Sequence, residues 1–449
     1  MDAVGAEVPG REFRGLGERL RSPAMRRRGL LLLRAAAIAS AVAGLLDFVV
    51  APLQGRFAGE FEDYKDYLAA AKAVTQHSDI YGSFLNHVQP IPVQGFDYPP
   101  VVAWLLQPLA GLPPTTAATA WLLLLLACTV AGTAIIAFEL LPATWPRLEL
   151  TAVFSLVYAP ITYNLWHGQM SAVVYLFLAL ALRSWLRGKQ FSLGVYIGIA
   201  ALIKLAPVLL IVLLLRRRWW AACVSLGVTL ALGIGVGVLA LGVGTLREYV
   251  TRVLPVLGQQ NGWIYNQSAA GAVNRLVGHS VLAFQPSSIL MTVVIVTIAV
   301  VAVGAAAWMV RPAEVSRDVR GGQFALGILA MLLAGSVTWF WHLGALLIVL
   351  ASVASLVAGH GVHRPRRIAI AGWAVLLATG VAAPLFIAFT SMPGLIALSH
   401  SWLWWPALQL VSAPALAIAA LFVVLAVALR QQMVYRMGSE PLITTASVQ

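Results

Sequence analysis

Apolar stretches long enough to cross a membrane recur along this 449-residue chain, and they restrict its fold more than any other feature. A helix needs about 20 apolar residues to span a bilayer. Hydrophobic residues make up 60% of the chain, well above the roughly 45–50% of soluble domains. Because a helix satisfies its own backbone polar groups in hydrocarbon, the sequence predicts an all-α polytopic membrane protein, with 11 to 13 crossings.

We expect three parts: a basic N-terminal segment over 1–28, a membrane domain over 29–430 and a disordered tail over 431–449. The segment after Arg28 shows no small-residue cleavage site followed by a soluble domain, so it predicts a retained first helix over about 30–52.

The net charge of +13 does not indicate nucleic-acid binding, because the positive charges lie in short connections between apolar runs. Such connections are typical of the cytoplasmic side of a membrane protein, which also places both termini there. The basic connections are Arg26–Arg28, Arg183 to Lys189, Arg216–Arg218, Arg311 to Arg320, His363 to Arg367 and Arg430 to Arg436.

Lys204 lies inside an apolar stretch whose two ends are both basic. The stretch, 190–215, is too short for two full crossings, so we expect it to run outward and return as two short segments. Lys204 would then lie near the outer turn.

On this topology the unusual polar groups gather on the outer side, where we expect them to line one cavity. They are Glu62, Asp63 and Asp66, FDYPP at 96–100, WHGQMS at 166–171, Lys204, YNQS at 265–268, Arg275, and TWFWH at 338–342. Ionisable groups at membrane depth are costly and usually functional. A carboxylate could act as a general base, cationic side chains could hold a phosphate, and aromatic rings could stack on a sugar. This set predicts a glycosyltransferase that uses a lipid-phosphate sugar.

An ordered series of short motifs resembles glycosyltransferase family 87, of the GT-C superfamily, over roughly residues 30 to 430. The motifs are Asp63-Tyr64-Lys65-Asp66-Tyr67, Asp79-Ile80-Tyr81, Tyr98-Pro99-Pro100, Gly168-Gln169, Lys204 with Pro207 ahead of Arg217-Arg218-Trp219, Asn266-Gln267-Ser268, and Trp339 with His342. The chain departs from the family pattern at Asp66, where an apolar residue is common, and after His342, where a second histidine is common.

The resemblance implies a GT-C-type helical bundle with an extracytoplasmic cavity in the cytoplasmic membrane. It further implies inverting transfer of mannose or arabinofuranose from a polyprenyl monophosphate to a glycan or glycolipid, without a nucleotide sugar. The first-loop aspartate is the expected base, which assigns Asp63 that role, with Asp66 as the alternative. The expected substrate-binding residues are Lys204, His342, Gln169, Asn266, Arg275, Tyr98 and Asp66. Of the two sugars, mannose in α-1,2 linkage is favoured.

The same residues also allow other interpretations. A lipid-sugar flippase would also carry ionisable residues in its membrane domain, although we find no internal repeat of the kind transporters show. Each candidate ligand could instead be a helix-packing or interfacial residue. We expect no cofactor and no divalent metal, and Cys128 and Cys223 are predicted to be packed thiols because both lie in apolar runs.

Overall fold

The computed structural model describes residues 23–57, 61–86, 95–259, 262–277, 289–310, 315–359, 365–382 and 404–439. These parts of the chain are helical and contain no strand; the one β-bridge among them joins Asn266 to Trp339. The predicted all-α fold is therefore confirmed.

Six helices in the described ranges are long and apolar enough to cross a membrane. They are Arg27–Leu53, Pro114–Leu140, Trp220–Leu257, Ile289–Met309, Phe340–Ala358 and Gln409–Gln431. Shorter apolar helices cover Pro100–Ala110, Ser171–Leu186 and Gln190–Ile203. The protein is a multi-pass membrane protein, and the total of 11 to 13 crossings remains a prediction.

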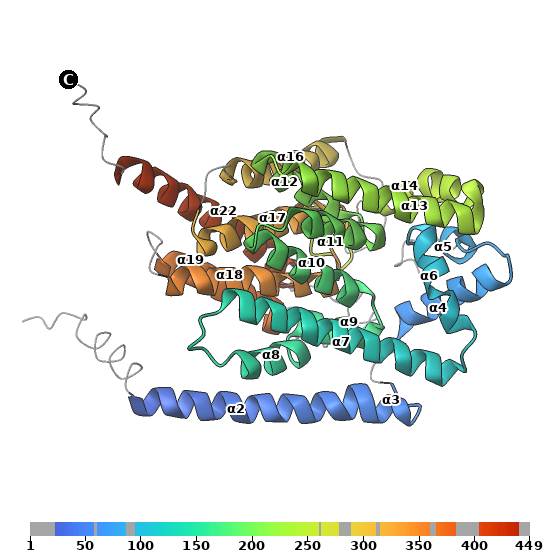
Figure 1. Ribbon diagram of the computed structural model, residues 1–449, viewed down its shortest axis with the longest axis horizontal. Coiled ribbons are helices and arrows are strands. Elements are labelled where there is room, and N and C mark those ends of the chain that lie inside the picture. The colour runs from blue at the N-terminus through green and yellow to red at the C-terminus, as the bar shows by residue number, and fades with distance from the viewer. Residues whose placement is uncertain are drawn as a thin grey trace, which may run out of the picture.

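The first helix lies along one edge of the molecule (Figure 1). It comprises α2 (Pro23–Leu45), the π-helical turn η1 (Leu46–Val50) and α3 (Ala51–Leu53). Arg34 of α2 binds Glu149 of α8 (Arg147–Leu156) with 3.1 Å between Nε and Oε1. Most of the large apolar side chains of this first helix are exposed, as expected for a helix that lipid surrounds.

A smaller apolar cluster holds the helices that follow. They are α4 (Glu62–Thr75), α5 (Gly82–Asn86) and α6 (Pro100–Ala110). Phe61 fixes the start of α4: its amide donates to the carbonyl of Trp166 at 3.2 Å, and its ring stacks on Phe57 and packs at a tilt against Tyr64. The acidic residues Glu62 and Asp63 occupy the first turn of α4, where the helix dipole favours negative charge.

The centre of the molecule is a bundle of apolar helices around one large buried core. Its members include α7 (Pro114–Leu140), α9 (Ala159–His167), α10 (Ser171–Leu186), α11 (Gln190–Ile203), α12 (Ile211–Arg217), α13 (Trp220–Glu248), α17 (Arg317–Ala334) and α18 (Leu346–Ala358). In Figure 1, α10, α11 and α17 lie in the middle of this bundle.

The chain reverses at Lys204, as the sequence predicted. Along α11 and α13, Gly194 meets Ser225 and Gly198 meets Thr229, so the contacts advance in the same sense and the two helices run parallel. The segment between them must therefore return, and it does so through the 3₁₀ helix η2 (Ala206–Leu210) and α12. Lys204 lies at the break between α11 and η2, in extended backbone.

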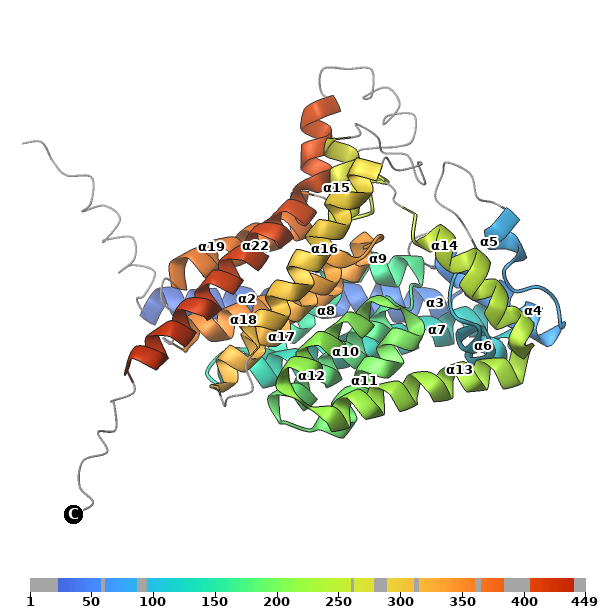
Figure 2. The same cartoon turned by 90° about the horizontal axis from the view of Figure 1, so that it is seen from above.

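The remaining elements complete the molecule. They are η3 (Tyr249–Val253), α14 (Leu254–Leu257), α15 (Ala269–Leu276), α16 (Ile289–Met309), η4 (Phe340–Ala345), α19 (Pro365–Leu377), η5 (Ala378–Ala382) and α22 (Trp404–Ser439). Figure 2 shows α16 and α22 together on one flank and α14 next to α5 on another. Helix α22 continues beyond residue 430, so 431–439 are helical where the sequence predicted disorder; residues 440–449 of that tail lie outside the described residues. The glutamines and methionine at 431–433 are good helix formers, which explains the extension.

One end of the bundle carries a cluster of arginines around Glu139. Arg187 binds its Oε1 at 2.7 Å and Arg183 at 3.3 Å, while Arg317 binds its Oε2. Two of the basic connections, Arg183 to Lys189 and Arg311 to Arg320, therefore supply residues to the same end of the molecule.

Candidate active site

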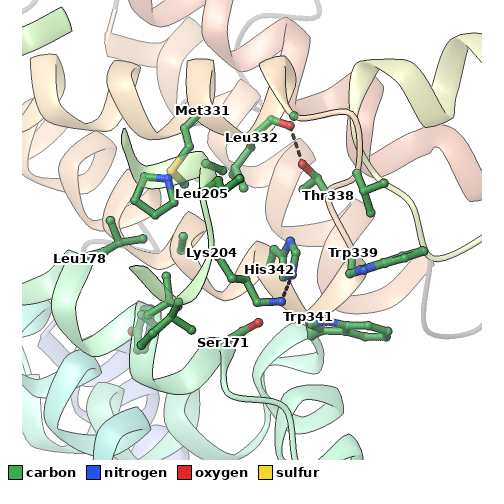
Figure 3. A pocket seen from close by; sticks show the side chains of 18 of the residues that line it. Ser171, Leu178, Lys204, Leu205, Met331, Leu332, Thr338, Trp339, Trp341 and His342 are labelled. Atoms are coloured by element: carbon green, nitrogen blue, oxygen red, sulfur yellow. Dashed lines mark hydrogen bonds between the residues drawn. The ribbon is translucent and has the colours of Figure 1, made fainter. Parts of the chain in front are cut away.

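A cavity of about 430 Å³ lies at the end of α10 and α17 that is opposite the arginine cluster around Glu139. Ser171, at the start of α10, and Met331 and Leu332, near the end of α17, line it. Lys204, from the turn after α11, and Trp339, Trp341 and His342, from the segment that enters η4, complete much of its wall (Figure 3). Segments that are far apart in the sequence thus converge on one space.

Lys204 and His342 meet directly in this cavity. The Nζ atom of Lys204 lies 2.6 Å from Nε2 of His342 (Figure 3). It also lies 5.4 Å from the centre of the Tyr98 ring. The ammonium group is a donor, so His342 Nε2 accepts and its proton is on Nδ1. An ammonium has three donors, and this arrangement leaves others free to bind an anion in the cavity.

The charges of two carboxylates act on this cation. Asp97 lines the cavity, whereas Asp63 is not among its lining residues. Burial raises the pKa of Asp97 to about 6, and Lys204 opposes the increase. Burial also raises the pKa of Asp63, again against the charge of Lys204. Burial lowers the pKa of Lys204, while the charges of Asp97 and Asp63 oppose that decrease.

Asp63 has an oxygen that lacks a hydrogen-bond partner in the described parts of the chain. The side chain is 27% exposed, yet its Oδ2 atom is buried. Nδ1 of His167 lies 4.0 Å from that oxygen. The His167 ring in turn lies 5.0 Å, between ring centres, from Trp341 in the cavity wall. His167 therefore links the aspartate to the cavity.

Gln169 and Tyr98 form a buried network next to the cavity. Oε1 of Gln169 accepts hydrogen bonds from the hydroxyls of Tyr67 at 2.8 Å and Tyr98 at 2.9 Å, and the two hydroxyls lie 2.9 Å apart. Tyr98 also lines the cavity. Asp66 lies further away and accepts from the amide of Gly95 at 2.8 Å.

Asn266 and Arg275 do not line the cavity; both hold the loop behind it. Asn266 Oδ1 accepts from the amide of Thr338 at 2.9 Å and thereby fixes the segment that leads to His342. Arg275 is fully buried and donates to the carbonyls of Trp263 and Asn266 at 2.8 and 2.7 Å. Their predicted contact with substrate would require these groups to move.

Comparison with known proteins agrees with the motif series. The model of glycosyltransferase family 87 matches residues 96–334, which is more than half of the chain. The chain belongs to glycosyltransferase family 87. Family 87 comprises glycosyltransferases, so this protein is a membrane glycosyltransferase, as predicted.

A curated relative of this family 87 protein comes from Mycobacterium tuberculosis (strain CDC 1551 / Oshkosh). It is a polyprenol-phosphate-mannose-dependent alpha-(1-2)-phosphatidylinositol pentamannoside mannosyltransferase. The two proteins are 27% identical over 351 residues, which cover 76% of each chain.

Three residues of the site, Asp97, His167 and Trp341, were assigned no role from the sequence, although they lie in the stretches FDYPP, WHGQMS and TWFWH that were expected to line the cavity. Each stands beside a residue that was assigned one: Asp97 precedes Tyr98, His167 is two residues before Gln169, and Trp341 precedes His342. In the described ranges no three His, Cys, Asp or Glu side chains gather as they would around a metal ion. Independence from a divalent metal stays a prediction.

Proposed function

We propose that this family 87 enzyme transfers mannose from a polyprenyl-phosphate carrier to a glycan or glycolipid acceptor. Transfer inverts the donor configuration, forms an α-1,2 linkage and takes place on the outer side of the cytoplasmic membrane. The observation that carries the proposal is the contact between Lys204 and His342 in the cavity, with 2.6 Å between their nitrogens. The charges of Asp97, which lines the cavity, and of Asp63, which does not, both act on this lysine.

The donor phosphate binds at Lys204. A phosphate oxygen is an acceptor and a cationic donor makes the strongest hydrogen bonds to it, so the ammonium group is its natural partner. His342 orients the ammonium by accepting one of its protons. Tyr98, whose ring faces the same ammonium, limits where the lysine side chain can move.

Asp63 acts as the general base. As the acceptor oxygen bonds to the anomeric carbon, its proton passes to the Asp63 carboxylate. The bond from the carbon to the phosphate oxygen breaks, and its electron pair leaves with the phosphate. The raised pKa of Asp63 supports this role, because a base is most effective when its pKa lies near the working pH.

The position of the cavity supports an outer active site. Helix α10 runs from one end of the bundle to the other. Its first residue, Ser171, lines the cavity, whereas Arg183 in its last turn and Arg187 just after it bind Glu139. Helix α17 does the same, with Arg317 at the cluster and Met331 at the cavity. If the basic end faces the cytoplasm, as positive-inside topology favours, the cavity faces the opposite side.

The choice of mannose rests on the mycobacterial relative, whose name specifies a polyprenol-phosphate-mannose donor and an alpha-(1-2) product. The test uses purified protein in lipid nanodiscs with polyprenyl-phosphate mannose or polyprenyl-phosphate arabinofuranose and a membrane glycolipid extract. We expect release of polyprenyl phosphate and labelled glycolipid with the mannose donor only.

Lys204→Met should abolish that release, whereas Lys72→Met, at an exposed lysine in the last turn of α4, should leave it unchanged. Transfer with arabinofuranose alone would overturn the choice of sugar. Movement of the donor across vesicles without any transfer would overturn the enzymatic proposal in favour of a flippase.

A further inference from the structure

The indole of Trp341 has a buried N–H group without an acceptor. The residue is 9% exposed and lines the cavity, and its Nε1 atom has no hydrogen-bond partner among the described residues. A buried donor without an acceptor has lost its hydrogen bonds to water, so native proteins contain few of them. A bound ligand that supplies an oxygen would satisfy the group.

The ring of Trp341 is held from three sides. It stacks on Trp339 with 5.7 Å between ring centres and an angle of 30°, and it packs on Tyr265 at 5.8 Å and on His167 at 5.0 Å. These contacts leave the indole little freedom to turn. The direction of its N–H bond is therefore set before a ligand arrives, which reduces the entropy cost of binding.

The neighbours of the N–H group indicate which acceptor it takes. Trp341 precedes His342, whose Nε2 contacts the Lys204 ammonium, and all three residues line the same cavity (Figure 3). An indole N–H is a donor only, and Lys204 contributes donors and a positive charge. A ligand group with several acceptor oxygens and a negative charge matches this set best.

We propose that the indole N–H of Trp341 donates a hydrogen bond to an oxygen of the same phosphate group that Lys204 binds. The proposal rests on the proposed function and adds one substrate-binding residue to it. The phosphate then has a cationic donor from Lys204 and a neutral donor from Trp341. The neutral donor contributes a fixed direction without adding charge to a cavity that already contains a cation.

The bond to Trp341 strengthens during transfer. The donor phosphate is a diester with one negative charge, and it leaves as a monoester with more negative charge after the carbon–oxygen bond breaks. The acceptor proton goes to Asp63, so charge builds up on the phosphate as the reaction proceeds. A fixed donor aimed at developing charge lowers the barrier more than it stabilises the substrate.

The variant Trp341→Phe tests this directly, because phenylalanine keeps an aromatic ring and removes the N–H. We expect binding of short-chain polyprenyl phosphate, measured by calorimetry in detergent, to weaken about 10-fold, as one lost hydrogen bond of about 1.4 kcal/mol predicts. kcat/KM for the mannosyl donor should fall by at least the same factor. Trp308→Phe, at an exposed tryptophan on α16, is the matched control and should change neither value.

A second variant, with benzothienylalanine at position 341, keeps the full two-ring shape and again lacks the N–H. It should match Trp341→Phe in phosphate binding while its unfolding temperature stays that of the wild type. Unchanged binding of polyprenyl phosphate in this variant would overturn the proposal. If only the KM for the sugar-bearing donor rose, the N–H would bind a sugar hydroxyl, which also overturns it.

The two proposals fail in distinguishable ways. If the wild-type protein transfers mannose and both variants bind polyprenyl phosphate normally, Trp341 is not a phosphate ligand and the proposed function stands. If the wild-type protein neither binds polyprenyl phosphate nor transfers a sugar, both proposals fail together.

Discussion

The Nδ1 atom of His167 lies 4.0 Å from Oδ2 of Asp63, a carboxylate oxygen that is otherwise buried without a hydrogen bond in the described parts of the chain. The contact joins the end of α9 to the first turn of α4. Gly168 makes it possible, because this residue has a φ of 66° and a Cβ there would collide with Phe61 and Tyr64. A protonated His167 stabilises the ionised form of Asp63.

Replacing His167 should therefore change the titration of Asp63. His167→Phe preserves an aromatic ring against Trp341 and removes the Nδ1 atom that lies 4.0 Å from Oδ2 of Asp63. We expect the acidic limb of the kcat–pH profile to move to higher pH and kcat at neutral pH to fall several-fold. The control is His77→Asn, at an exposed turn after α4 whose positive φ asparagine tolerates. An acidic limb at its wild-type pH would show that His167 only packs against Trp341.

The dependence of kcat/KM on pH should be bell-shaped, since Asp63 must be ionised and Lys204 protonated. Burial raises the pKa of Asp63, so the acidic limb, where activity rises with pH, should lie at a pH above the usual aspartate pKa of about 4. Burial lowers the pKa of Lys204, so the basic limb, where activity falls as the pH rises, should lie at a pH below the usual lysine pKa of about 10.

The variant Lys204→Arg separates these two limbs. It keeps the positive charge and does not titrate in this range, so the basic limb should disappear while the acidic limb remains. A basic limb that is unchanged in this variant would exclude Lys204 as its origin.

Much of the fold followed from the sequence, because apolar run length and the placement of basic residues are local signals. The turn at Lys204 was predictable for this reason. The partners of polar residues were not, since a buried polar group needs a hydrogen bond whether it binds substrate or backbone. Asn266 and Arg275 illustrate this: the carbonyls and amide that they bind lie in loops whose paths the sequence does not show.

His167 and Trp341 were assigned no role for a related reason. Tryptophan is common at membrane interfaces, so its type alone does not indicate a contact with substrate. The type of a single histidine does not show which side chain lies next to it. Two properties of the folded chain distinguish these two residues. Nδ1 of His167 lies 4.0 Å from Oδ2 of Asp63, and the indole N–H of Trp341 has no acceptor among the described residues.

The parallel packing of α11 against α13 should depend on Gly194. A Cβ at this position would collide with the carbonyl of Ala222 and the hydroxyl of Ser225. Gly194→Ala should lower the free energy of unfolding by about 1–3 kcal/mol, the usual cost of overpacking, and reduce activity because Lys204 directly follows α11. Gly227→Ala, where no atom lies within 4 Å of the added Cβ, should have the stability of the wild type or slightly more. Equal unfolding temperatures for the two variants would contradict the close packing.

Arg275 should contribute to stability through the loop it holds. Arg275→Gln leaves the carbonyls of Trp263 and Asn266 without their donor, which should lower the free energy of unfolding by about 2–4 kcal/mol. Arg252→Gln removes only an exposed ion pair with Glu248 and should cost less than about 1 kcal/mol. Thermal unfolding in nanodiscs gives both values, and an unfolding temperature for Arg275→Gln equal to that of Arg252→Gln would exclude this role.

Single-turnover transfer by Asp63→Asn, measured beside its binding of polyprenyl-phosphate mannose, examines the proposed chemistry most directly. Asparagine has nearly the same shape but cannot accept the acceptor's proton, so donor affinity should stay within a few-fold of the wild type while the transfer rate falls by about 10²–10⁴, the usual contribution of a general base. Asp66→Asn, measured in parallel, should retain transfer. Transfer by Asp63→Asn at the wild-type rate would show that the carboxylate beside His167 is not the base.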